Sequence, residues 1–94
     1  MSLTLNTVLA GTFSGTGTST PVFGRSINIA LDFAGTASID IERQMPSGSW
    51  VKVQTGITTD IDQVLEYPAK VTVRLNCTAF TNPVEYVVLT GSDG

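Results

Sequence analysis

The chain contains no histidine and a single cysteine, Cys77. Without histidine, the commonest general base and every Ser-His or Cys-His pair are excluded, and so are metal sites built from cysteine and histidine. The lone cysteine cannot form an internal disulfide, and its place in an apolar alternation predicts a small core residue. We therefore expect a protein that is not an enzyme and that holds no cofactor.

Charged residues are also scarce, at 14% of the 94 residues, against about 25% in an average domain. Five basic and eight acidic residues give a net charge of −3 and a pI near 4.5. This balance offers phosphates no positive field, so nucleic acid is not an expected partner. Long apolar runs and a basic, apolar leader are missing as well. We expect no signal peptide, no membrane contact and synthesis in a cytoplasm.

Fourteen threonines and eight serines take the place of the missing charges. Threonine is a favoured strand residue, and hydroxyl-rich faces also suit a sheet that contacts other proteins, so two interpretations stay open. A chain of this length buries only about 60–65% of its unfolded surface, so its core is small and association with other copies would add stability.

The run 35–54 is the most informative segment, because it predicts a long β-hairpin. Ala37, Ile39 and Ile41 alternate with polar residues, and a Pro-Ser-Gly turn leads to a return strand that begins at Trp50. One face of this hairpin is expected to lie on a core and the other in water.

Most of the remaining chain also alternates with period two. Further strands are expected over 22–33, 70–78 and 84–90. Residues 57–68 fit either a short strand plus a loop or a single helical turn. The chain is thus predicted to be all-β, an antiparallel β-sandwich or jelly-roll-like barrel of six to eight short strands in one domain, 1–94.

Residues 1–20 are expected to form an N-terminal arm or an edge strand, followed by a flexible loop rich in glycine, threonine and serine. An arm could add a strand to the open edge of a partner. The strands contain few lysines and prolines, the residues that commonly keep an edge strand from pairing with another chain. This also suggests that another subunit covers one of the edges. The interface candidates of this segment are Leu3, Leu5, Val8 and Phe13.

Trp50 and Tyr67 are the aromatic interface candidates, since flat amphipathic rings supply large contact areas. Trp50 shares the parity of the polar residue Lys52. It is therefore either a partly exposed aromatic at the sheet edge or, as we favour, a half-buried lid over one end of the core.

Two groups of carboxylates deserve comparison as candidate sites. Asp40 and Glu42 lie two apart on one strand face, where they could share a proton or bind Ca²⁺, but a solvated outer face is the simpler interpretation. Asp60, Asp62 and Glu66 are a better calcium candidate, because they gather oxygen ligands in a loop, although their spacing matches no EF-hand.

The run Gly35–Arg43, followed across a glycine-containing turn by Trp50–Val53 and later by Val73–Cys77, resembles a group of small virion proteins of tailed bacteriophages. In that group a Gly-Thr strand ending in Glu/Gln-Arg precedes a turn and a Trp-x-x-Val strand, and an Arg-Leu-x-Cys-like strand follows. The similarity spans about residues 22–90. The turn at 44–49 differs from the group's usual Ser and Asp-Gly-Gly, so this loop is expected to contact something different.

The resemblance implies a structural protein of the virion that decorates or cements the capsid shell by binding the major capsid protein or another virion protein. It also implies a homo-oligomer, with a trimer favoured, that is made in the host cytoplasm and located in the virion. Two alternatives stay open. One is a tail or fibre-attachment adaptor of the virion, and the other is a small carbohydrate-binding β-sandwich module with Trp50 and Tyr67 side by side.

Overall fold

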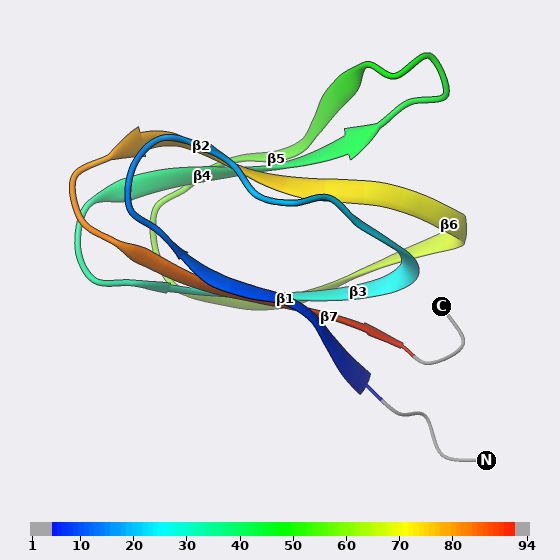
Figure 1. Ribbon diagram of the computed structural model, residues 1–94, viewed down its shortest axis with the longest axis horizontal. Coiled ribbons are helices and arrows are strands. Elements are labelled where there is room, and N and C mark those ends of the chain that lie inside the picture. The colour runs from blue at the N-terminus through cyan, green and yellow to red at the C-terminus, as the bar shows by residue number, and fades with distance from the viewer. Residues whose placement is uncertain (1–4, 92–94) are drawn as a thin grey trace.

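The computed structural model describes residues 5–91, with side chains from residue 9 onward (Figure 1). It confirms the all-β prediction, because it contains seven strands, every strand pair is antiparallel, and residues 5–91 form no helix. The strands are β1 (Leu5–Phe13), β2 (Gly17–Thr18), β3 (Val22–Phe33), β4 (Ala37–Gln44), β5 (Trp50–Ile57), β6 (Ile61–Phe80) and β7 (Val84–Gly91).

All seven strands belong to one sheet in the order β1-β7-β3-β6-β4-β5, with β2 paired to β6 off this path. The sheet is not closed into a barrel. It folds over on itself to give a sandwich-like structure (Figure 1). The first layer contains β1, β7, most of β3 and the beginning of β6, and the second layer contains β2, β4, β5 and the rest of β6.

The sheet folds over at a bend that β3 and β6 share. Gly24 pairs with Val71 and Ser26 with Glu66, so residues 67–70 of β6 lie opposite Arg25 alone. Pro68 has no N–H to donate, and a break in the ladder is where a strand tolerates it. The irregularity also reverses the alternation of β3, because Val22 is buried before the bend and Ile27 after it.

Apolar side chains from both layers form one core between them. The buried members are Phe13, Val22, Ile27, Ile29, Leu31, Ala37, Ile39, Ile41, Ile57, Val71, Val73, Leu75, Cys77, Val84 and Val88. The ambiguous segment 57–68 contains no helical turn: β5 ends at Ile57, residues 58–60 connect the strands, and residues 61–66 of β6 pair with β3. The alternation expected for 22–33 and 70–78 is confirmed at Ile27, Ile29, Val73 and Leu75.

Two connections close one end of the sandwich by bonding to each other. The carbonyl of Thr36 accepts hydrogen bonds from the N–H groups of Thr81 and Asn82, at 3.0 and 2.9 Å. The side-chain oxygen of Asn82 accepts the N–H of Thr36 in return, at 2.9 Å. Gly35 fits against this amide, and a Cβ atom at that position would overlap it.

We expect Gly35→Ala to lower the free energy of unfolding by about 1–3 kcal/mol, because the added methyl group must displace Asn82 from its hydrogen bond. Urea denaturation measures the change. Gly15→Ala is the matched control, since nothing lies within 4 Å of its added Cβ. An equal effect of the two substitutions would contradict this account of the connection.

Candidate functional site

Asp40 and Glu42 form a hydrogen-bonded cluster on the outer face of β4. Lys52 Nζ donates to Asp40 Oδ2 at 2.6 Å and to Glu42 Oε2 at 3.3 Å. The N–H of Gly56 donates to Asp40 Oδ1 at 2.9 Å. Arg74 Nε donates to Glu42 Oε1 at 2.7 Å and Asn76 Nδ2 to Glu42 Oε2 at 3.1 Å. Each of the four carboxylate oxygens therefore has a donor.

The expectation that Asp40 and Glu42 lie on a solvated face is wrong. They are only 6% and 5% exposed, although their face points away from the core. The long side chains of Lys52 on β5 and Arg74 on β6 lie beside β4 and cover both carboxylates. The alternation of residues along β4 alone does not show which side chains of the neighbouring strands cover it. This arrangement makes the pair an ion-pair cluster rather than a proton-sharing pair or a cation site.

The cluster keeps both carboxyl groups ionised. Burial by itself raises the pKa of Asp40, but the hydrogen bonds from Lys52 and Gly56 outweigh it, so that the pKa lies below its usual value. Burial likewise raises the pKa of Glu42, and the bonds from Asn76, Arg74 and Lys52 bring it below the usual value. The two carboxylates in turn raise the pKa of Lys52.

Gly56 is the one residue of this cluster with a positive backbone φ angle. Its φ of +64° lies in the left-handed region, which glycine adopts without strain. That conformation lets its N–H reach Asp40. In the sequence Gly56 marks a break in the alternation, whereas in the structure β5 continues through it to Ile57.

Trp50 is half-buried, as expected, but it is not a lid over the core. It lies opposite Gln44 at the start of β5. The Arg74 guanidinium lies 3.9 Å from the centre of its ring. This cation–π contact extends the cluster from Glu42 through Arg74 to the indole.

Tyr67 is packed against the core at the bend, away from the Trp50 contact. The Arg43 guanidinium lies 5.2 Å from the centre of its ring. The described aromatic rings include one close pair, Phe13 with Tyr86 at 4.8 Å, and Trp50 and Tyr67 are not paired. A flat two-ring platform for a sugar is therefore not formed by these side chains.

The N-terminal candidates lie in or before an edge strand. Leu5 and Val8 belong to β1, which pairs along β7 of the same chain, and β1 ends one side of the sheet. Phe13 is buried in the core against Tyr86, so it does not face a partner. Leu3 lies outside the described residues.

Two of the three proposed calcium ligands, Asp60 and Asp62, accept hydrogen bonds from β3, and Glu66 is exposed. Asp60 Oδ1 accepts the N–H of Phe33 and Asp62 Oδ1 accepts Asn28 Nδ2, both at 2.8 Å. Within residues 5–91 no three acidic, cysteine or histidine side chains are placed to hold a metal ion. Cys77 is buried in the core as predicted, and burial raises the pKa of its thiol.

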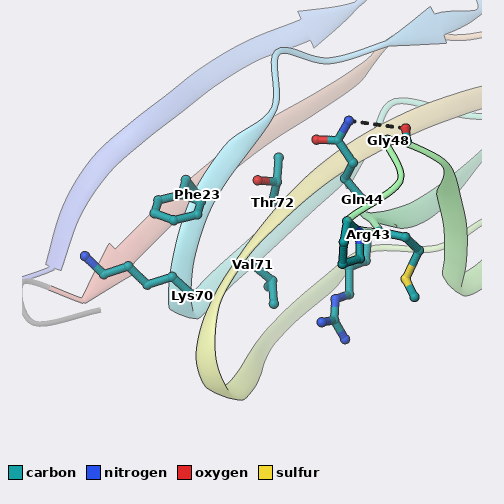
Figure 2. A pocket seen from close by; sticks show the side chains of 9 residues that line it. Phe23, Arg43, Gln44, Gly48, Lys70, Val71 and Thr72 are labelled. Carbon is teal, nitrogen blue, oxygen red and sulfur yellow. Dashed lines mark hydrogen bonds between the residues drawn. The ribbon is translucent and has the colours of Figure 1, made fainter.

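A pocket of about 400 Å³ opens between the β4–β5 hairpin and the bend (Figure 2). We call it the hairpin pocket; it is lined by Phe23, Arg43, Gln44, Met45, Pro46, Gly48, Lys70, Val71 and Thr72. Phe23 is 61% exposed, and Met45 is exposed as well. Figure 2 shows Lys70 and Arg43 on either side of Val71. The hairpin pocket thus combines apolar surface with two cations and no lining carboxylate.

The β5 strand forms the other candidate surface. Among residues 5–91 it pairs with β4 alone, so the backbone groups of its other side are free to pair with another chain. Val51 and Val53 are exposed on it. Lys52, its only charged residue, is held by Asp40 and Glu42.

Sequence reasoning missed the hairpin pocket for a physical reason. Phe23 shares the odd parity of Ile27 and Ile29, which places it in the core of an unbroken strand. The bend turns it outward. The pair Gly24-Arg25 before a long apolar alternation was the available signal of an irregularity.

None of the protein-family models, curated proteins or solved structures compared with the chain matches it. The described residues include no helix long and apolar enough to cross a membrane.

We expect Glu42→Gln to lower the free energy of unfolding by about 1–3 kcal/mol, because an amide cannot satisfy both Arg74 and Lys52 and places a donor against donors. Glu85→Gln makes the same change at an exposed carboxylate and should alter stability by less than about 0.5 kcal/mol. Urea denaturation at neutral pH measures both, and equal effects would contradict the role of the cluster.

Stability should also fall on acidification. Because the pKa values of Asp40 and Glu42 are lowered on folding, their contribution is complete above the unfolded values of about 4 and is lost as the pH decreases below them. Unfolding free energies measured from about pH 7 to about pH 2 should therefore decrease less steeply for Glu42→Gln than for the natural chain. If the unfolding free energies of the natural chain and of Glu42→Gln decreased in parallel, the cluster would not be the cause of the loss of stability at acidic pH.

Proposed function

We propose that this chain is a non-enzymatic structural protein of a virion that decorates or cements the capsid shell by binding the major capsid protein through β5. The observation that carries the proposal is the uncovered edge of β5. Among residues 5–91 nothing pairs with one side of its backbone, and Val51 and Val53 are exposed along it. Strand addition to such an edge is a common way for one chain to bind another.

The missing protection of this edge supports the proposal. Proteins that stay monomeric usually guard edge strands with charged side chains, lysine above all. Here Lys52 is the only such residue on β5, and both of its ion pairs point it at Asp40 and Glu42. The carboxylate cluster thus leaves the edge available to a partner.

The dimensions of the molecule suit a plate that bridges neighbouring subunits. Its extents are 42 × 32 × 17 Å, so a broad face exceeds the roughly 800 Å² that each partner contributes to a standard interface. A rigid plate bound to two neighbours opposes their separation, because separation would expose the area that it buries.

The assignment to a virion rests on the resemblance of residues 35–43, 50–53 and 73–77 to phage virion proteins. The first two segments form the β4–β5 hairpin, and the third is the part of β6 that pairs with β4. The turn at 44–49, where the chain differs from that group, contributes to the wall of the hairpin pocket.

The test is to mix the purified protein with capsids that lack it and to count the bound copies after sedimentation. We expect stoichiometric binding in the hundreds of copies per shell. Val53→Lys should weaken capsid binding by at least about tenfold, because an unpaired lysine on an edge strand disfavours the addition of another strand. Thr16→Lys adds the same charge to the β1–β2 loop, where β6 and β4 separate β2 from β5, and should bind as the natural chain does.

Two results would contradict the proposal. A dozen copies or fewer per particle would indicate a tail or fibre-attachment adaptor instead of a shell protein. Full binding by Val53→Lys would show that β5 is not the contact.

A further inference from the structure

Charge is divided unequally between the two layers. The first layer carries no lysine or arginine on β1, on β7, on residues 27–33 of β3 or on residues 61–66 of β6. Its exposed carboxylates are Asp32, Asp62, Glu66 and Glu85. Asp32 and Glu85 are paired directly across β3 and β7, an arrangement of like charges that costs stability.

All five cations lie in the second layer or at the bend. Lys52 and Arg74 are neutralised by Asp40 and Glu42. Arg25, Arg43 and Lys70 make no ion pair with any described residue. Two of these, Arg43 and Lys70, line the hairpin pocket.

The two cations of the hairpin pocket are held over aromatic rings. Lys70 Nζ lies 5.8 Å from the centre of the Phe23 ring, and the Arg43 guanidinium lies over Tyr67. The buried Nε of Arg43 has no hydrogen-bond acceptor within the described part of the chain. Ring faces position these charges without neutralising them, so the pocket keeps its attraction for an anion.

The first layer presents a matching surface on β6. Val64 is 54% exposed, the largest exposure among the large apolar side chains of that layer from residue 9 onward, and it lies between the exposed carboxylates of Asp62 and Glu66. Side chains two apart on a strand point to the same face and are about 7 Å apart. We call these three residues the acidic stripe.

We propose that the hairpin pocket of one molecule binds the acidic stripe of a second copy of this chain. Val64 of the stripe packs on Phe23 and Met45, and the carboxylates on either side of it meet Lys70 and Arg43. The apolar Val64 thus meets apolar side chains, and the anions on either side of it meet cations. The two surfaces are complementary both in their apolar groups and in their charges. This contact gives two of the three unpaired cations, Lys70 and Arg43, a partner among the two carboxylates of the acidic stripe.

The contact joins two different patches, so it is heterologous. The pocket belongs to the β4–β5 hairpin and the bend, and the stripe lies on the outer face of the first layer. A molecule bound through its pocket still presents a free stripe, and the contact therefore repeats into a ring or an extended array. Such an array deepens the proposed function, because linked copies can cover a shell, while the β5 edge stays free for the capsid.

Light scattering on the purified protein, without capsids, tests this inference separately from capsid binding. We expect the mass to rise above that of a monomer with increasing concentration and to decrease again at high salt, which screens the charges. Lys70→Glu and Glu66→Lys should each weaken association by at least about tenfold. Val64→Ser should weaken it without any change in charge.

A mixture of Lys70→Glu and Glu66→Lys is the most direct test. The first variant keeps its acidic stripe and the second keeps its hairpin pocket, so the mixture should recover association. Glu85→Lys is the matched control. It makes the same change on the same layer, about 20 Å along the strands from Glu66, and should associate like the natural chain. A monomer at every concentration, single variants that associate normally, or a mixture that stays monomeric would each overturn the inference. Thermal melts confirm that these exposed substitutions leave the fold intact.

Discussion

β3 and β6 change layers together, and one sheet can enclose a core only because they do. Arg25 on one strand and residues 67–70 on the other interrupt their ladder at the same place. Beyond the interruption each strand continues in the opposite layer, so β6 contributes Leu65 to one side and Leu75 to the other. The same bend turns Phe23 outward and forms one wall of the hairpin pocket.

The distribution of charge follows from this architecture. The second layer buries two carboxylates under Lys52 and Arg74, and these four groups neutralise one another on the outer face of β4. The remaining cations gather at the bend and the remaining described carboxylates on or beside the first layer. With so few charges in the chain, such a separation gives the molecule two faces of opposite sign, and Coulomb attraction then favours contacts between unlike faces of different copies.

Much of the fold was predictable from the sequence, because alternation depends only on which face of a strand meets the core. The strand 22–33 and the β4–β5 hairpin were predicted on that basis, but the core face expected for the hairpin holds for Ala37, Ile39 and Ile41 and fails on β5, where Val51 and Val53 are exposed. The burial of Asp40 and Glu42 was not predictable in this way, since it depends on which side chains of β5 and β6 lie beside β4. The exposure of Phe23 could not be predicted for a related reason. A single irregularity in the ladder of β3 exchanges the residues that face the core with those that face outward in the part of the strand before it.

The central claim is that the unpaired charges of the two layers meet between copies. Zero-length coupling of amines to carboxylates in a mixture of isotopically labelled and unlabelled protein tests it most directly. The account predicts cross-links between Lys70 of one label and Asp62 or Glu66 of the other. Cross-links that join residues of the same label alone, or none at Lys70, would contradict it.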